Sequence, residues 1–229
     1  MEYWNVGHGA MYEDFCFRFV SARGGTILDA GCGLGFFLKH MADYPAWECH
    51  GCELSTVAVE YAQSHLGLNN IQNTTIEKAS FKPNSFDIIT LWDVIEHIPS
   101  PDSLLTGLSK LLNAKGFLFI HTPNAAIQIH KARMKKLFFG MRPETHYLEA
   151  RDHCHIYTPT SMRLLVKRNG FSDIRFTHLR PIQSIAGRGG MPRTFAKTLW
   201  HHASIMLDRL SKGRINMDNL FVIARKSNA

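Results

Sequence analysis

The feature that most constrains the fold of this chain is the stretch at residues 26–38, which reads TILDAGCGLGFFL. Its first five residues form a short apolar run with one acid, Asp29, a pattern typical of a buried strand. Three glycines follow at alternate positions, Gly31, Gly33 and Gly35. A helical pattern begins at Phe36. Because glycine adopts positive φ and lets a ligand approach the backbone, the stretch predicts a strand, a tight turn and a helix. The turn serves either a ligand or packing alone.

The spacing of these glycines argues against a dinucleotide site. They give GxGxG where the dinucleotide fingerprint is GxGxxG, and Asp29 precedes the turn. A carboxylate at that position would repel a pyrophosphate, whereas it would attract an amino group or a sulfonium. The turn therefore predicts a site for a positively charged small molecule.

A second acid, Glu53, closes the stretch at residues 47–53, which we expect to be a strand. Glu53 lies 18 residues after Gly35. An acid about 20 residues beyond a glycine turn binds ribose hydroxyls in dinucleotide sites, because a carboxylate accepts two hydrogen bonds. The alternative role, capping the helix at residues 55–66, fits Ser55 better, because serine is a preferred N-cap residue.

Four segments carry a family resemblance. They read LDAGCGLG at residues 28–35, GCELS at 51–55, FDIITLWDVIEHIPSP at 86–101 and FLFIHTPN at 117–124. In sequence and order they resemble the motifs of the class I S-adenosylmethionine-dependent methyltransferases, in a branch similar to the ubiquinone-biosynthesis O-methyltransferases. The resemblance covers most of the chain and fades after about residue 176. It implies an α/β fold: a Rossmann-like, seven-stranded, mostly parallel sheet with helices on both faces, whose last two strands form an antiparallel hairpin.

The same resemblance implies where the cofactor binds. Its methionine end would lie against the glycine turn, its ribose at Glu53, and its adenine beside the turn after the third strand, which we expect over residues 71–76. Thr75 stands where many family members have an acid, with Glu77 two residues later. The residues expected to contact S-adenosylmethionine, or its product S-adenosylhomocysteine, are Asp29, Gly31, Cys32, Gly33, Gly35, Phe36, Glu53, Leu54, Thr75, Ile76, Leu91, Trp92 and Asp93.

Histidines are the candidate catalytic residues. Methyl transfer is an in-line displacement that needs an aligned acceptor and, for a hydroxyl acceptor, removal of its proton. Histidine suits that work near neutral pH. We rank His97 first because it follows the fourth strand, and His153 and His155 next because they follow a segment expected to cover the substrate. His121 and His146 are further candidates, and a structural role is the alternative for each.

A metal site is a further alternative in the same region. Asp93, Glu96 and His97 have the spacing i, i+3, i+4, which would bring them to one side of a helical turn. Carboxylate and imidazole groups suit a divalent ion. The ubiquinone branch has a similar acid-x-x-Glu-His run linked to magnesium, but its first acid is Glu rather than Asp. We therefore predict no metal ligands and keep magnesium as the less favoured alternative.

The chain is expected to form one methyltransferase domain over residues 1–229, with basic insertions at about 125–157 and 181–217. In the second insertion an apolar helix face is formed by Phe195, Leu199, His202, Met206 and Leu210. This face has three interpretations: packing on the chain's own core, pairing in a homodimer, or lying on an anionic membrane. A helix over residues 9–22 is expected near the cofactor, with Tyr3, Trp4 and His8 ahead of it.

The net charge of +7 favours an acidic partner. Candidate partners are a phosphate-bearing acceptor, an anionic membrane surface and nucleic acid, and the alternative is a solvated basic face. From the resemblance we expect a small-molecule or lipid-linked acceptor. The chain is expected to be a monomer or a homodimer.

The cysteines and the apolar runs bear on location. The chain has five cysteines, an odd number, which favours a reducing cytoplasm. Cys49 and Cys52 form an isolated CxxC within an expected strand, so we interpret them as buried thiols. No apolar run approaches 18 residues, and the N-terminus has acids where a signal peptide would have a basic head. We expect a cytoplasmic protein, or one peripheral to a membrane.

Two other functional classes stay open. The chain has two basic clusters, the first formed by Lys131, Arg133, Lys135, Lys136 and Arg142 and the second by Arg188, Arg193, Lys197, Arg209, Lys212 and Arg214. They suggest a nucleic-acid methyltransferase, although the chain has no NPPY-like run and no appended RNA-binding module. Binding that falls steeply with salt would mark this class. A protein that binds S-adenosylmethionine without turnover is the other alternative, because no single catalytic base stands out.

Overall fold

The computed structural model describes residues 2–20, 22–140, 153–181, 191–211 and 216–227. Its centre is a seven-stranded sheet in the order β3-β2-β1-β4-β5-β7-β6. The first five strands run parallel, and β7 is antiparallel to both β5 and β6. The strands are β1 (Gly25–Ala30), β2 (Trp47–Glu53), β3 (Ile71–Asn73), β4 (Phe86–Trp92), β5 (Leu112–Thr122), β6 (Phe171–Thr177) and β7 (Leu220–Lys226). The Rossmann-like, mostly parallel sheet expected from the sequence is confirmed.

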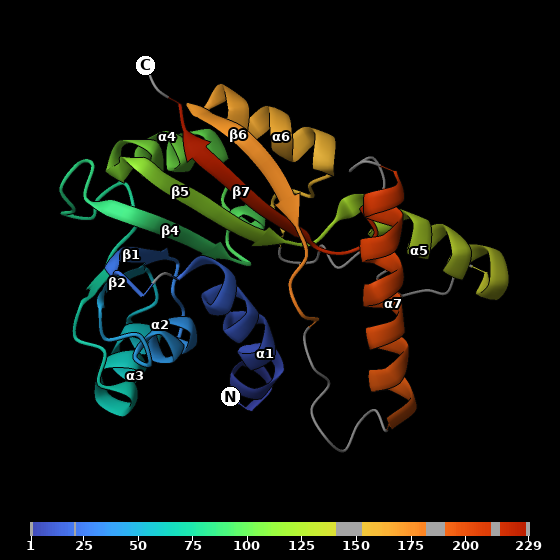
Figure 1. The fold of residues 1–229 in the computed structure, drawn as a ribbon, viewed down its shortest axis with the longest axis horizontal. Helices are drawn as coiled ribbons and strands as arrows, with labels where there is room; N and C mark the ends of the chain where they lie inside the picture. The colour runs from blue at the N-terminus through green and yellow to red at the C-terminus, as the bar shows by residue number, and fades with distance from the viewer. Residues whose placement is uncertain (1, 21, 141–152, 182–190, 212–215, 228–229) are drawn as a thin grey trace.

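Helices cover both faces of this sheet (Figure 1). α1, α2 and α3 lie on one face, α4 and α6 lie on the other, and α5 and α7 stand beyond the edge where the parallel strands end. The helices are α1 (Glu2–Phe19), α2 (Phe36–Met41), α3 (Thr56–Leu66), α4 (Pro101–Leu111), α5 (Ala125–Phe139), α6 (Pro159–Arg168) and α7 (Met191–Leu210), with a short 3-10 helix, η1 (Ile95–His97). No helix in the described ranges is long and apolar enough to cross a membrane.

The core has two parts, one on each face of the sheet. The face under α4 and α6 is mainly aliphatic. The face under α1 and α2 is aromatic: the ring centroids of Trp92 and Phe119 are 4.7 Å apart, and those of Phe15 and Phe119 are also 4.7 Å apart. β4 is apolar on both faces because it is a central parallel strand. This packing fixes the ends of β1 and β4.

Local sequence signals set several element ends as expected. The Ser55 side chain accepts a hydrogen bond from the Ala58 N–H and caps α3, and Gly67 ends that helix in the left-handed conformation.

All five cysteines are free thiols. Burial raises the pKa of Cys49 to about 11, so this residue is a protonated thiol at neutral pH.

Three elements differ from expectation. α1 begins at Glu2, so Tyr3, Trp4 and His8 lie within the helix rather than ahead of it. The helix tolerates its two glycines because each costs only about 1 kcal/mol. β3 ends at Asn73 because a turn follows. β5 begins earlier, at Leu112, and includes Gly116, where a Cβ would lie 2.8 Å from the Asp87 carbonyl oxygen. Glycine there permits a close strand contact and does not mark a strand boundary.

Candidate functional site

A cavity of about 980 Å³ opens where β1, β2 and β4 end. Ligands of open α/β sheets bind at this edge, because the loops that follow parallel strands meet there. Turns after β1, β2, β3 and β4 line the cavity, and α1 adds a wall. The lining includes Tyr12, Asp29, Ala30, Gly31, Cys32, Gly33, Leu34, Phe36, Phe37, Cys52, Glu53, Leu54, Thr74, Thr75, Ile76, Glu77, Lys78, Trp92, Asp93, Val94, His97, Ile98, Pro99, Ser100, Ser103 and Leu104.

The three glycines of the first turn have different surroundings. All have positive φ, at 78° for Gly31, 52° for Gly33 and 81° for Gly35. A Cβ on Gly31 would lie 2.7 Å from Val94 Cγ2, and one on Gly35 would lie 2.6 Å from Leu68 Cδ1. A Cβ on Gly33 would meet nothing within 4 Å. Gly31 and Gly35 therefore permit tight packing, whereas Gly33 leaves open space beside the cavity.

Glu53 is held at the cavity by backbone donors. The Gly33 N–H donates to Glu53 Oε2 at 2.9 Å, and the Ser55 N–H donates to Oε1 at 2.8 Å. Asn73 Nδ2 donates to the carbonyl oxygens of Glu53 and Leu54, which fixes the turn itself. Each carboxylate oxygen retains a second lone pair, so the group can still accept hydrogen bonds from two ligand hydroxyls.

Asp29 is a buried acid in the cavity wall. It is 2% exposed, and the Thr90 hydroxyl donates to its Oδ1 at 2.7 Å. Burial raises its pKa to about 7, the Thr90 hydrogen bond opposes that rise, and the charge of Glu53 adds to it. No lysine or arginine forms a salt bridge with Asp29 within the described ranges. A cationic ligand group would therefore compensate this carboxylate.

Asp93, at the other end of the cavity, contacts two histidines. Its Oδ1 lies 3.1 Å from Nδ1 of the buried His121, and its Oδ2 lies 3.9 Å from His8 Nε2. Burial opposes ionisation of Asp93, but the close contact with His121, with His8 and His97 nearby, outweighs it and lowers the pKa of Asp93. Burial also opposes a charge on His121, yet Asp93 raises the pKa of that imidazole. Asp93 therefore favours the charged form of His121, and His121 favours the charged form of Asp93.

The expected helical grouping of Asp93, Glu96 and His97 is wrong. Asp93 has a left-handed φ of 52° and lies outside η1, so it does not share a helical turn with the other two. Its carboxylate faces histidines, while Glu96 Oε2 accepts a hydrogen bond from Thr122 Oγ1 at 2.8 Å. The described residues instead bring Glu96, His97 and His153 together.

The three predicted catalytic histidines occupy different positions. His97 lines the cavity, and the centroid of its ring is 4.7 Å from that of His153, which lies outside the lining. His155 also lies outside the lining, with its Nε2 3.2 Å from the Pro99 carbonyl oxygen. His146 falls outside the described residues.

Most of the predicted cofactor residues line one cavity. Two do not: Gly35 precedes α2 behind the turn, and Leu91 is fully buried in the aliphatic core. The cavity brings together Asp29, Gly31, Cys32, Gly33, Phe36, Glu53, Leu54, Thr75, Ile76, Trp92 and Asp93.

Sequence reasoning missed Tyr12, which lines the cavity from α1. Its ring packs edge-on against Trp92 and Phe37, at centroid distances of 5.0 and 5.4 Å. Burial, with Asp29 and Asp93 nearby, raises the pKa of Tyr12, so the phenol stays protonated. Its spacing of three from Phe15 is typical of one buried helix face but does not place it at the cavity. Ser100 and Ser103, at the start of α4, were also missed.

Comparison with known proteins gives a family match. Residues 12–175 match the family model described as "Methyltransferase domain". The chain is 30% identical over 117 residues to the ubiquinone biosynthesis O-methyltransferase of Neisseria meningitidis serogroup C, 48% of this chain and 49% of that protein. It is 33% identical over 169 residues to the enzyme of that name from Vibrio atlanticus, 69% of each chain. The chain thus spans about half the length of the first of these curated relatives.

Solved structures share the fold at low identity. A SAM-dependent methyltransferase from Archaeoglobus fulgidus has a TM-score of 0.61 at 16% identity, over 98% of this chain and 97% of that one. A phosphoethanolamine N-methyltransferase 2 from Haemonchus contortus, solved with S-adenosyl-L-methionine, has a TM-score of 0.57 at 18% identity, over 95% of this chain and 52% of that one. At these identities the likeness concerns the fold alone.

Proposed function

This chain belongs to the methyltransferase-domain family, and from that premise we propose that it transfers the methyl group of S-adenosylmethionine to an oxygen atom of a small or lipid-linked acceptor. The observation that carries the proposal is the cavity in which Asp29, the glycine turn and Glu53 meet at the ends of β1 and β2. The choice of oxygen follows the printed names of the curated relatives, which are O-methyltransferases.

We assign one part of the cofactor to each wall of the cavity. The cationic amino group would compensate the buried Asp29, the backbone beside Gly33 would leave room for the methionine part, and Glu53 would accept the two ribose hydroxyls. The turn that contains Thr75, Ile76 and Glu77 lies next to Glu53 in the lining and would meet the adenine. In this orientation the methyl group faces Trp92 and Asp93.

The acceptor would enter at the wall formed by Asp93, His97 and Ser100. Catalysis then consists mainly of alignment, because the sulfonium is already electrophilic and the two reacting atoms must meet in line. A hydroxyl acceptor must also lose its proton, and we propose that a residue at this end of the cavity accepts it. Asp93 alone is a weak base because His121 and His8 hold its pKa low. We therefore assign removal of the acceptor's proton to His97, the imidazole in the cavity lining.

Two outer helices support a lipid-linked acceptor. α5 exposes the apolar residues Met134, Leu137 and Phe138 beside exposed Lys131, Arg133 and Lys136, and it contains no acid. α7 exposes Leu199, Trp200, Met206 and Leu210. Leu199, Met206 and Leu210 belong to the face for which core packing was one interpretation, and their exposure contradicts that interpretation.

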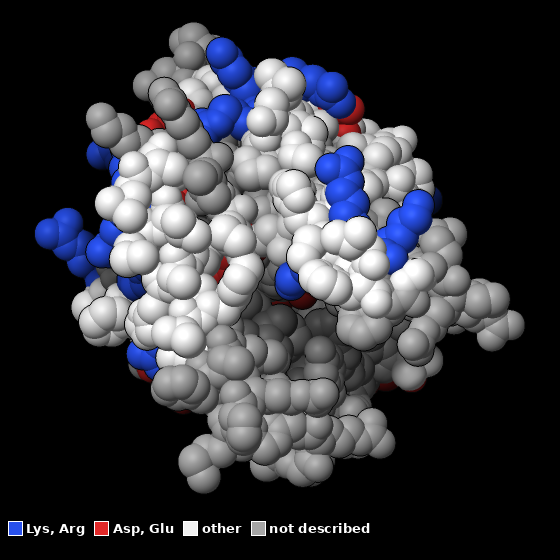
Figure 2. Space-filling view, turned by 90° about the vertical axis from the view of Figure 1, so that its right-hand side faces the viewer, with Lys and Arg blue, Asp and Glu red and all other residues white. Residues whose placement is uncertain are grey.

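Both helices stand at the edge where the cavity opens (Figure 1). Lysine and arginine side chains are more prominent than acidic ones on this side of the molecule (Figure 2). Arg209 is the one member of the second basic cluster whose side chain is described. Apolar side chains flanked by cations fit the surface of an anionic membrane, where each basic residue contributes about 1 kcal/mol.

Methyl transfer itself tests the main proposal. The full chain would be incubated with S-adenosylmethionine and phenols, catechols or amines, with and without an apolar tail, and S-adenosylhomocysteine would be measured. We expect release with a tailed phenol or catechol and loss of release in Asp29→Asn. Binding of the cofactor without release for any acceptor would favour the non-catalytic alternative. Activity that depends on added RNA would favour the nucleic-acid alternative.

Vesicle co-sedimentation tests the membrane surface. The chain should bind vesicles that contain phosphatidylglycerol more strongly than vesicles of phosphatidylcholine alone, and salt should weaken that binding. Equal binding to both compositions would contradict the proposed surface and leave the cofactor site unaffected.

A further inference from the structure

We propose that Glu96, His97 and His153 bind a borderline divalent cation, of the class that includes zinc and cobalt, at the wall of the cavity. The proposal rests on the proposed function for its catalytic meaning, but the ion site can be tested without activity. Donor atoms of these three side chains lie within 4.8 Å of one another. Zinc ligands lie about 2.0–2.2 Å from the ion, so donor atoms of a tetrahedral site are ~3.4 Å apart. Small rotamer changes would close the site.

The backbone holds the His153 segment beside η1. The Glu96 carbonyl oxygen accepts hydrogen bonds from the N–H groups of Cys154 and His155, at 2.8 and 3.0 Å. Cys154 Sγ donates to the His97 carbonyl oxygen at 3.4 Å. These contacts join two segments far apart in sequence and set His153 beside His97. The pairing of the two imidazoles is therefore built into the local backbone.

The carboxylate of the set has a supporting contact. Glu96 is 2% exposed, and the Thr122 hydroxyl donates to its Oε2 at 2.8 Å. Such a contact orients a ligand and leaves the second carboxylate oxygen for an ion. Of the three residues, Glu96 is buried, His153 is half-buried and His97 is exposed, and His97 is the one that lines the cavity.

The chemistry of this set does not fit magnesium, the ion that the acid-x-x-Glu-His run implied. Magnesium demands octahedral coordination by oxygen, whereas two of the three donors are imidazole nitrogens. Asp93, the first residue of the run, faces His121 and His8 instead. Two nitrogens and one oxygen suit zinc, cobalt or a similar ion, with a fourth position left open.

An ion of this class lowers the pKa of a hydroxyl that it holds. Because His97 lines the cavity, the open position would face the acceptor. In the protein with the ion bound, His97 would therefore act as a ligand of the ion and not as the base.

Cobalt(II) binding tests the proposal directly. Untagged, chelator-treated full chain would be titrated with cobalt(II), with absorbance and bound metal as the readouts. We expect about one ion per chain, retained in a large excess of magnesium, and the visible absorption of four-coordinate cobalt. His153→Ala should weaken binding by more than the roughly 10–100-fold that follows loss of an outer-shell partner.

His155→Ala is the matched control, because it removes a neighbouring imidazole that lies outside the set. It should leave cobalt binding unchanged, and His153→Gln provides a second variant if the alanine form misfolds. No cobalt binding, equal losses in the His153 and His155 variants, or displacement by magnesium would overturn the proposal. S-adenosylmethionine binding, measured in parallel, should be unchanged in all three variants, and its absence from the wild-type chain would count against the proposed function instead.

Discussion

Two regions of this molecule present charge and apolar surface in different ways. At the ends of β1 and β2, Asp29 and Glu53 are fixed by hydrogen bonds from Thr90 and from backbone N–H groups. At α5 and α7, apolar side chains such as Leu137 and Leu210 are largely exposed. The first arrangement presents fixed charges to a small polar ligand, whereas the second presents an adaptable surface to something large. We infer that cofactor binding and acceptor delivery are separable in this chain.

The largest expected effect concerns the glycine turn at the cofactor site. Gly31→Ala would add a Cβ 2.7 Å from Val94 at a φ of 78°, and we expect it to lower the free energy of unfolding by about 2–4 kcal/mol. Gly33→Ala should cost only about 1–2 kcal/mol, the left-handed penalty, because its Cβ would meet nothing. Urea unfolding of both variants measures the difference, and equal losses would contradict the distinction.

The second prediction concerns Asp29 and pH. Its pKa is about 7, so below that pH the carboxyl is protonated and no longer attracts a cation. Affinity for S-adenosylmethionine should therefore fall as pH drops below about 7, approaching tenfold per unit. Calorimetry between pH 5 and pH 7.5 tests this slope, and Asp29→Asn should abolish it. A slope that persists in Asp29→Asn would assign the titration to another group.

The third prediction separates the exposed apolar surface of α5 and α7 from the cofactor site. Replacing Leu137 and Leu210 with serine should weaken binding to anionic vesicles roughly 30-fold, because burial of each leucine in the membrane contributes on the order of 1 kcal/mol. Binding of S-adenosylmethionine should not change, because neither residue lines the cavity. A loss of cofactor affinity in this double variant would contradict the inference that cofactor binding and acceptor delivery are separable.

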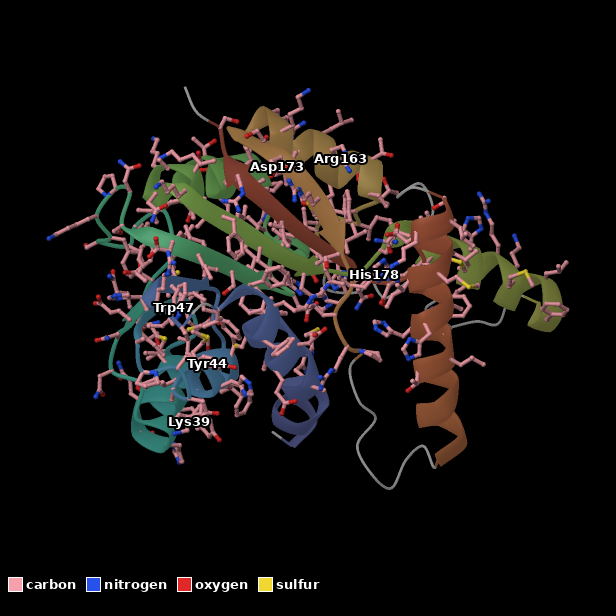
Figure 3. The ribbon with its side chains drawn as sticks, viewed as in Figure 1. Lys39, Tyr44, Trp47, Arg163, Asp173 and His178 are labelled. Carbon is pink, nitrogen blue, oxygen red and sulfur yellow. The ribbon has the colours of Figure 1, made fainter. Side chains whose placement is uncertain are left out.

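The smallest expected effect lies where α7 meets the sheet. His178 follows β6 and faces α7 (Figure 3), with Nε2 3.3 Å from Asp208 Oδ2 and Nδ1 3.7 Å from Asp218 Oδ2. Burial opposes its charge, but the nearby carboxylates of Asp218 and Asp208 outweigh burial and raise its pKa. A raised pKa stabilises the fold below the unfolded value, about 6.5, and this contribution is lost as pH rises through the folded value.

His178→Gln should therefore cost about 1 kcal/mol of unfolding free energy at pH 6 and less at pH 9. Thermal unfolding at the two values measures this. His202→Gln, which changes an exposed histidine of α7, is the control and should have no effect. A larger loss at pH 9 would contradict the ion pairs.

The sequence was sufficient for the parts of the fold that local signals determine. The bounds of β4 follow from its apolar run, those of β2 and β6 agree with the prediction, and the ends of α3 follow from Ser55 and Gly67. It could not foresee contacts that depend on register. Trp92 pairs with His121 in the sheet, and this register brings His121 beside Asp93. Tyr12 reaches the cavity only because α1 packs against α2, a tertiary contact without a local signal.

Calorimetric binding of S-adenosylmethionine and S-adenosylhomocysteine to the wild-type chain and to Glu53→Ala tests the proposed cofactor site directly. The account predicts micromolar binding of both ligands and a loss of about 1–3 kcal/mol in the variant, because the ribose hydroxyls lose their acceptor. Glu77→Ala, in the turn after β3, should lose less. Wild-type chain that binds neither ligand, or Glu53→Ala that binds as tightly as wild type, would contradict the account.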